Sequence, residues 1–264
     1  MGFFDEVKAL TTGQKAYRTH VAANRLANEG RIDEAKAQYD KALGLYERAA
    51  GGGLDKPEIL LGYAILLMRT GEIERAGEQM RAVSRMQGLK ESDWFDLRLN
   101  YAVYHWKQGR LDEAIETARR AAKVRKNAAI YTVLGIFLTD KARETGDFGE
   151  AEAFNAEAME YDDEDAGILD NMGCMFEAMA AHAGAAGDAE RAAECRAKAR
   201  AYFARAHEVR PRQISTIYAL ATMYHEDGDD AAAREVLASA VNLYYSGTCP
   251  VSEDMMNALI AEVG

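Results

Sequence analysis

The chain has 264 residues, 48% of them hydrophobic, and only three prolines. This composition provides ample core material and suits an all-helical protein better than one with long loops. The formal net charge of −11 disfavours nucleic-acid phosphates as the main partner, because like charges repel. The longest apolar run, residues 59–68, is about half of what a bilayer-spanning helix needs, so no integral membrane segment is expected.

Glycines recur along the chain at steps of 37 to 41 residues, and each is followed five positions later by an alanine. Apolar residues on both sides have helical spacing, so each glycine is predicted to end one helix in the left-handed conformation. Repetition at this period predicts a stack of similar helical hairpins. The six glycines are Gly30, Gly71, Gly109, Gly146, Gly187 and Gly228.

The first predicted element is a short amphipathic segment that contains Phe3, Phe4, Val7 and Leu10. It would cap the first hairpin, touch a membrane surface weakly or lie in a groove. Six hairpins are then expected, with a flexible glycine-rich linker at residues 51–57 between the first two. Their approximate ranges are 14–50, 57–88, 92–126, 128–163, 165–211 and 213–245.

Two features stand out in the C-terminal half. Both helices of the fifth hairpin are predicted to be longer by about two turns, which gives either an inert projection or a docking lip. Residues 252–263 are predicted to form a helix that caps the last hairpin, because an array must cover its exposed end. Ser252 would begin this helix, and its apolar stripe would consist of Met256, Leu259, Ile260 and Val263.

Small and aromatic residues recur at fixed places in these units, as in Ala35, Tyr39 and Ala42 of the first unit and Ala199, Phe203 and Ala206 of the fifth. In this pattern the chain resembles the tetratricopeptide repeat (TPR) family over about residues 14–245. The resemblance implies an all-α fold: an α-solenoid in which antiparallel helix pairs form a right-handed superhelix, its first helices lining a concave groove. It also implies one repeat domain over residues 1–264.

Extending the resemblance position by position places a set of side chains in that groove, apolar in the middle of the array and more polar toward its C-terminal part. An exposed apolar concavity favours capture of an amphipathic helix or an extended peptide. Trp106 would contribute most to binding if it is exposed. The predicted groove residues are Leu61, Ile65, Met68, Leu99, Asn100, Val103, Trp106, Val133, Ile136, Asn171 and Tyr218.

No set of residues has the spacing of a catalytic or metal site, so no catalytic residues, metal or cofactor are expected. The acidic run at residues 162–165 lacks the ligand alternation of a calcium loop, and Asp165 is predicted to begin a helix instead. Three cysteines in odd number and without metal spacing favour a reducing, cytoplasmic compartment.

The sequence therefore predicts a non-catalytic protein–protein interaction module that binds a peptide or helix of an unidentified partner. Two alternatives stay open. One is a structural homo-oligomer, such as a homodimer, in which a terminal segment fills the groove. The other is a sensor that changes its superhelical pitch when it binds a signalling peptide or metabolite.

Overall fold

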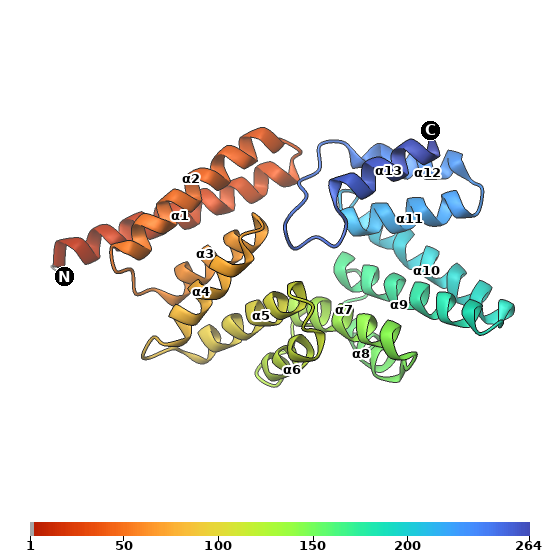
Figure 1. Cartoon of the computed structure of the whole chain (residues 1–264), viewed down its shortest axis with the longest axis horizontal. Helices are drawn as coiled ribbons and strands as arrows, with labels where there is room; N and C mark the ends of the chain where they lie inside the picture. The colour runs from red at the N-terminus through yellow and green to blue at the C-terminus, as the bar shows by residue number, and fades with distance from the viewer. Residues whose placement is uncertain (1–2) are drawn as a thin grey trace. The chain divides into compact units, whose positions relative to one another are not determined.

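The computed structural model describes residues 3–264, and in that range the chain is helical and forms no strand. The expected all-α fold is confirmed, as Figure 1 shows. The first six helices are α1 (Phe3–Asn28), α2 (Ile32–Gly51), α3 (Pro57–Arg69), α4 (Ile73–Ser84), α5 (Glu91–Lys107) and α6 (Leu111–Ala122). The remaining ones are α7 (Ala128–Thr145), α8 (Gly149–Tyr161), α9 (Ala166–Ala185), α10 (Ala189–Val209), α11 (Ile214–Glu226), α12 (Asp230–Leu237), the 3-10 helix η1 (Ala238–Ala240) and α13 (Glu253–Val263).

The helices pair into antiparallel hairpins, α1 with α2 through α11 with α12, and together they form an α-solenoid. Each pair turns at one of the six predicted glycines. All six adopt left-handed φ angles between 72° and 86°, so their role in ending the first helix is confirmed. A residue with a Cβ would be strained at these positions.

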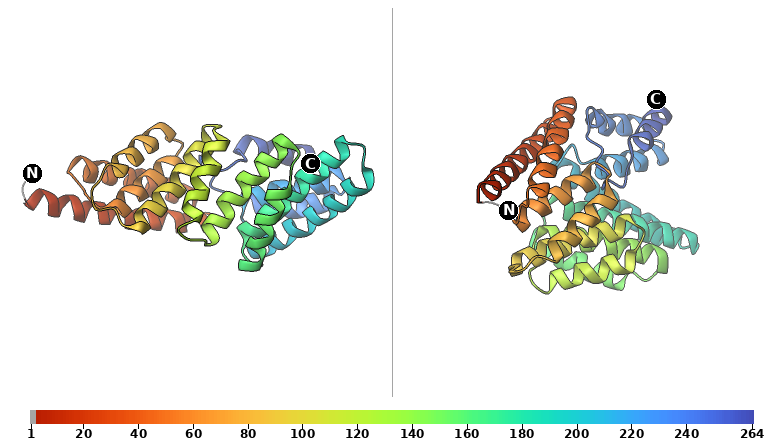
Figure 2. Two further views of the ribbon diagram at one scale, coloured as in Figure 1. Left: turned by 90° about the horizontal axis from the view of Figure 1, so that it is seen from below. Right: turned by 60° about the vertical axis from the view of Figure 1, so that its left-hand side comes forward.

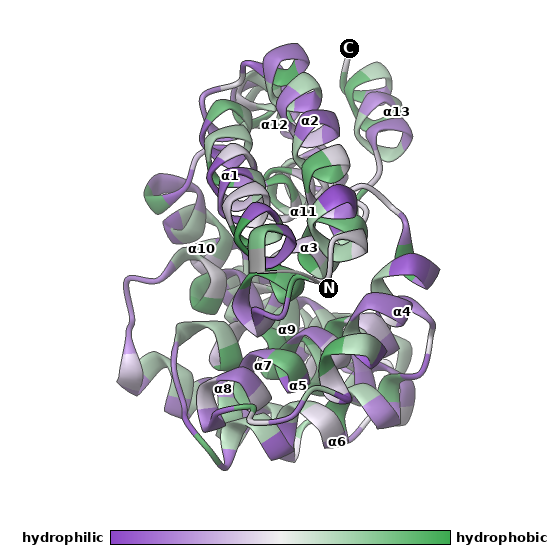
Figure 3. Cartoon of the chain, turned by 90° about the vertical axis from the view of Figure 1, so that its left-hand side faces the viewer, coloured by the Kyte–Doolittle hydropathy of each residue, from purple (hydrophilic) through white to green (hydrophobic). Residues whose placement is uncertain are grey.

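The alanine that follows each glycine by five positions lies where the paired helices approach each other. Five of these six alanines are buried, whereas Ala192 in the fifth hairpin is half-buried. Side chains of this size permit close packing without voids. Individual helices carry both a hydrophobic and a hydrophilic face, as Figure 3 shows, and the hydrophobic faces form the core.

The chain divides into two compact units. Unit 1 comprises Met1–Val124 together with Asn242–Thr248, and unit 2 comprises Arg125–Val241 together with Cys249–Gly264. The single repeat domain expected over residues 1–264 stays a prediction.

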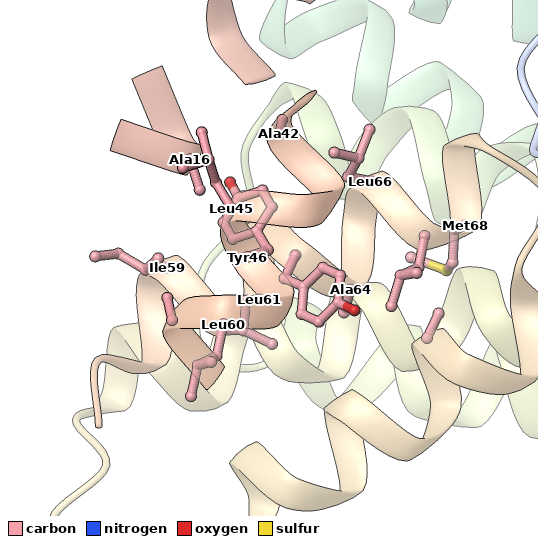
Figure 4. Packing of buried hydrophobic residues seen from close by; sticks show 14 of the residues in the cluster. Ala16, Ala42, Leu45, Tyr46, Ile59, Leu60, Leu61, Ala64, Leu66 and Met68 are labelled. Carbon is pink, nitrogen blue, oxygen red and sulfur yellow. The ribbon is translucent and has the colours of Figure 1, made fainter. Parts of the chain in front are cut away.

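In unit 1, the core is formed mainly by α2 and α3 with the inner face of α1. Figure 4 shows Leu45 and Tyr46 of α2 beside Leu61 and Ala64 of α3. The ring of Tyr46 stacks on that of Tyr63 with centroids 5.3 Å apart. Burial of such large rings is a major source of stability for the unit.

In unit 2, the fifth hairpin is longer than its neighbours, as predicted. Its helices α9 and α10 have 20 and 21 residues and lie side by side in Figure 2. Asp165 begins α9 as predicted. Its carboxylate accepts hydrogen bonds from the backbone N–H groups of Gly167 at 2.8 Å and Ile168 at 3.0 Å.

The capping helix α13 begins at Ser252, whose hydroxyl accepts from the N–H of Met255 at 3.1 Å, and it packs on α11 and α12. Met256, Leu259 and Val263 are buried, but Ile260 is 41% exposed. The predicted stripe is therefore wrong at Ile260, because only three of its four positions face the last hairpin.

Both ends of the array differ from the expected ranges. Helix α1 runs continuously from Phe3 instead of following a separate short segment; Phe4 is 87% exposed, and the side chain of Phe3 lies outside the described part. Helix α12 ends at Leu237, earlier than expected, because the chain passes through η1 and then turns at Asn242, which has a φ of 52°. The following residues form no helix and belong to unit 1.

Candidate binding cleft

Unit 1 contains a cleft of about 620 Å³ lined by the first helices of three successive hairpins. This volume lies within the range of small-ligand and peptide side-chain pockets. Its lining consists of Gln14, Tyr17 and Arg18 from α1; Glu58, Ile59, Leu61, Gly62 and Ile65 from α3; and Asp96, Leu99 and Asn100 from α5.

The helical period explains why these residues share one surface. On each helix the lining residues include pairs three or four positions apart, the separation at which side chains lie on the same face. Leu61 and Ile65 lie one turn apart on α3, and Asp96 and Asn100 do so on α5. Stacking of the three hairpins brings the three faces together.

The apolar part of the cleft is formed mainly by Ile59, Leu61, Ile65 and Leu99. Leu61 is only 3% exposed and forms the floor, whereas Ile65 is 40% exposed at the surface. A branched side chain with this exposure, in contact with other apolar residues, is poorly shielded from water. Its burial by a ligand would be favourable.

The rim of the cleft is polar and carries both signs of charge. Arg18, Glu58 and Asp96 are exposed there. The Asn100 amide nitrogen donates to the backbone carbonyl of Asp96 at 2.8 Å, a bond within α5. The rim therefore offers two carboxylates and one guanidinium around an apolar floor.

Gly62 allows the aromatic wall of the cleft to approach α3. A Cβ at this position would lie 3.0 Å from the Tyr46 hydroxyl and 3.2 Å from Cδ2 of Tyr17. Both distances are shorter than ordinary van der Waals contact, so the missing side chain lets Tyr17 lie close over the helix.

Beneath the cleft, His20 is 5% exposed and lies near the core tyrosines. Its Nδ1 is 3.4 Å from the Tyr46 hydroxyl. Burial, and then the charge of Arg69, lower the pKa of His20 from 6.5 to about 4. Burial raises the pKa of the Tyr46 hydroxyl. Both groups are therefore uncharged at neutral pH, as a well-packed interior requires.

The structure places four of the predicted groove residues in this cleft: Leu61, Ile65, Leu99 and Asn100. Met68 is buried in the core at the other end of α3. Val103 and Trp106 lie farther along α5 and are half-buried outside the cleft lining. Val103 packs against the core, and the Lys107 ammonium lies 4.8 Å from the Trp106 ring centroid.

Comparison with known proteins agrees with this architecture. The family model of the tetratricopeptide repeat matches residues 20–88 and, in a second overlapping match, residues 64–129. These stretches contain the cleft-lining residues of α3 and α5, whereas those of α1 precede residue 20. The chain therefore carries tetratricopeptide repeats over residues 20–129.

Solved structures with the same fold include two of IFIT1. A monomeric mutant of IFIT1 with Gppp-AAAA matches with a TM-score of 0.63 at 18% identity, over 84% of this chain and 49% of that chain. The human IFIT1 dimer with PPP-AAAA matches with a TM-score of 0.60 at 18% identity, over 76% of this chain and 45% of that chain. This TPR protein thus spans about half the length of these chains. No curated protein matches its sequence.

In unit 2 of this TPR protein, the predicted groove residues lie in different surroundings. Val133 and Ile136 on α7 and Tyr218 on α11 are half-buried. Asn171 on α9 is only 2% exposed, and its amide nitrogen donates to the backbone carbonyl of Thr132 at 2.8 Å. This amide therefore links α9 to α7 and does not face an open surface.

Unit 2 has a cleft of its own, of about 540 Å³, that the sequence did not indicate. Its cations are already paired: Arg143 with Asp140 and Glu177, and Arg196 with acidic residues of α11 and of the turn after it. Alanines make up much of its wall, and their small side chains leave a hollow beside α9 and α10. They are Ala178, Ala180, Ala181, Ala192 and Ala193.

Two further findings bear on function. Among the helices of residues 3–264, none has the length and apolar character needed to cross a membrane. In the same range, no group of three or more His, Cys, Asp or Glu side chains is placed to hold a metal ion.

Proposed function

We propose that this protein is a non-catalytic interaction module that binds an amphipathic helix or short peptide of a partner protein in the cleft of unit 1. The observation that carries the proposal is Ile65, an isoleucine 40% exposed above the floor formed by Leu61 and beside Leu99. Apolar anchors spaced one turn apart on a ligand helix would cover such a surface.

The rim favours a peptide over a nucleic acid as the ligand. The IFIT1 structures were solved with PPP-AAAA and Gppp-AAAA, so a phosphate-bearing ligand is the natural alternative. In this cleft, Glu58 and Asp96 are exposed beside a single arginine, Arg18. Two carboxylates repel phosphates but suit a ligand that combines apolar side chains with a lysine or arginine.

A matched pair of isoleucines provides the test. Ile65 is 40% exposed in the cleft, and Ile260 is 41% exposed on α13 of unit 2. Peptides selected on the wild-type protein from a random display library would be titrated against Ile65→Glu and Ile260→Glu by calorimetry. We expect affinity to fall at least about tenfold in Ile65→Glu and to be unchanged in Ile260→Glu.

Equal binding by both variants would exclude this cleft as the binding site. Enrichment of short RNA, and of no peptide, in a parallel selection would instead favour the phosphate-bearing alternative.

All three cysteines are free thiols, in keeping with a reducing compartment, and we propose that the protein acts in the cytoplasm.

A homodimer is a second candidate, favoured by apolar residues at the start of α1. Phe4 is 87% exposed and Val7 is 46% exposed on this helix. These side chains would fill the cleft of a second copy or pair with their own counterparts. Light scattering of the wild type and of the double variant Phe4→Glu, Val7→Glu would decide: a wild-type monomer at all concentrations would exclude the dimer.

A further inference from the structure

A segment near the C-terminus, Asn242–Thr248, belongs to unit 1 although the residues on both sides of it belong to unit 2. It follows η1 and precedes α13 (Figure 1) and contains no helix. Leu243 is 8% exposed, and Tyr244 packs against the core of unit 1. The segment is therefore held by specific contacts.

The first contact holds the ring of Tyr244. Its centroid lies 5.0 Å from that of Tyr39 on α2. The guanidinium carbon of Arg69, the last residue of α3, lies 4.9 Å from the Tyr244 centroid and 5.4 Å from the Tyr39 centroid. A guanidinium near two aromatic rings gains cation–π attraction that no aliphatic side chain at position 244 would supply.

The second contact is a backbone hydrogen bond at the end of α3. The N–H of Gly247 donates to the carbonyl oxygen of Arg69 at 2.7 Å. The last carbonyls of a helix have no partner within the helix, so they are free to accept from another segment. Within the segment, the Ser246 hydroxyl accepts from the N–H of Thr248 at 3.2 Å and supports the turn around Gly247.

The third contact is the close approach of Gly247, which has no side chain, to the backbone at the end of α3. A Cβ there would lie 2.6 Å from the carbonyl oxygen of Met68 and 2.7 Å from the backbone nitrogen of Gly71. Both atoms belong to the backbone at the end of α3 and cannot move aside as the tip of a side chain can. Only glycine fits at this position.

We infer that Tyr39, Arg69 and the carbonyl end of α3 form a second peptide-binding site, which recognises a non-helical segment with a tyrosine followed three residues later by a glycine. In this chain the occupant is its own segment 242–248. The tyrosine is selected by the aromatic and guanidinium groups, and the glycine by the steric limit at the end of α3.

Covalent attachment makes this occupant hard to displace. A tethered segment acts at an effective concentration of about a millimolar, so a free peptide of the same sequence competes poorly unless the tethered one is released. The segment is thus an internal ligand, and any change that releases it would open the site to the same segment of another copy.

The test uses the full chain with two glycine variants. Gly247→Ala introduces the clash with α3, whereas Gly44→Ala is the control, because a Cβ at Gly44 meets only the end of the Arg48 side chain at 3.6 Å. Hydrogen exchange would be measured by mass spectrometry over residues 242–248. We expect exchange there to accelerate at least about tenfold in Gly247→Ala and to be unchanged in Gly44→Ala.

A free peptide of sequence Asn-Leu-Tyr-Tyr-Ser-Gly-Thr would then be added at millimolar concentration, with NMR signals of the Tyr39 and Arg69 side chains as the readout. We expect it to shift these signals in Gly247→Ala and to leave the wild type unchanged. The same peptide with alanine in place of its glycine should shift neither protein.

If Gly247→Ala does not fold, Tyr244→Ala replaces it, since it removes a ring without adding any atom to the interface. Unchanged exchange over residues 242–248 in the variant would overturn the inference. So would the failure of the free peptide to bind the variant, or its equal binding to the wild type.

Discussion

In unit 1, the first helices of the hairpins leave Ile65 exposed beside a cleft, whereas in unit 2 the first helices α7, α9 and α11 are joined by buried polar groups. Asp170 on α9 accepts hydrogen bonds from the hydroxyls of Ser215 at 3.0 Å and Thr216 at 2.5 Å on α11. Asn171 connects α9 to α7 in the same way. The same repeat architecture thus uses its inner positions for an open surface in one unit and for internal connections in the other.

The difference shows that a polar residue at a groove position of a helical repeat is not by itself evidence of a ligand. Asn100 and Asn171 have the same side chain and similar places on their helices. One makes a bond within its own helix at the edge of a cleft, and the other bonds to a neighbouring helix and is buried. What distinguishes them is whether a backbone carbonyl of a neighbouring helix lies within hydrogen-bond distance of the amide.

The largest expected effect comes from the core of unit 2. Phe203 is fully buried, and its ring packs closely on Gly173: a Cβ at Gly173 would lie only 2.5 Å from the ring. Phe203→Ala should lower the free energy of unfolding by about 3–5 kcal/mol, as measured by urea denaturation. Phe4→Ala, at an exposed position, should change it by less than about 0.5 kcal/mol.

The same variant tests whether the two units are cooperatively independent. Hydrogen exchange in Phe203→Ala should accelerate in α9 and α10, while the amides of α2 around Tyr39 stay protected. Equal acceleration in both places would mean that the units unfold together, and the comparison between them would then concern local structure only.

The buried carboxylate of unit 2 gives the next effect. Asp170→Ala leaves the hydroxyls of Ser215 and Thr216 without their acceptor, and we expect a loss of about 2–3 kcal/mol in chemical denaturation. Asp170→Asn keeps one acceptor oxygen and should lose less. An unchanged free energy of unfolding in Asp170→Ala would show that the connection between α9 and α11 depends on apolar packing instead.

The third prediction concerns the pH dependence of stability that two buried groups, His20 and Asp170, produce. In unit 1, burial lowers the pKa of His20 to about 4, so between pH 6.5 and 4 the unfolded chain binds a proton that the folded chain does not. Stability should therefore decrease as the pH falls through this window, by about 2 kcal/mol at pH 5. His20→Gln should flatten the dependence between pH 7 and pH 5, and His182→Gln, at an exposed position, should not.

For Asp170 in unit 2 the sign is opposite, whereas burial lowers the pKa of His207 in the same unit, as it does that of His20. Burial raises the pKa of Asp170, so above its ordinary range the folded chain retains a proton that the unfolded chain releases. The contribution of this group to stability decreases as the pH rises through that window. Asp170→Asn should remove this pH dependence. The part of the slope of unfolding free energy against pH that Asp170 contributes should be subtracted before the remainder is assigned to His20.

The smallest expected effect is the difference in the free energy of unfolding between two asparagine variants. Asn171→Ala should cost about 1–2 kcal/mol, since it removes a buried hydrogen bond to α7. Asn100→Ala should cost less than about 0.5 kcal/mol, because the bond that it removes is partly exposed and lies within α5. If the costs were equal, Asn100 would have a structural role comparable to that of Asn171.

Much of the fold could be predicted from the sequence, because its determinants are local. Gly109 and the other five glycines mark the turns through a backbone conformation that other residues avoid, and Ser252 and Asp165 begin helices through bonds to residues two or three positions away. The part of the cleft formed by Leu61, Ile65, Leu99 and Asn100 could also be predicted, since the helical period places the residues of each helix on one face and the repeat pattern aligns the faces of α3 and α5.

The remaining features depend on contacts between distant parts of the chain. Nothing near Asn171 in sequence indicates that a carbonyl of Thr132 is its acceptor. The placement of residues 242–248 in unit 1 depends on Arg69 and Tyr39, which precede the segment by more than a hundred residues. A glycine and two tyrosines in that segment have no periodic pattern from which this contact could be inferred.

The glycine at position 62 gives a way to adjust the cleft without altering any apolar residue that lines it. A methyl group there would press against the rings of Tyr17 and Tyr46, and because Tyr46 is fully buried, the more exposed Tyr17 is the one that would swing outward. One carbon atom would then set the width of the opening. An alanine at this position would therefore change the shape of the cleft while the helical scaffold stays the same.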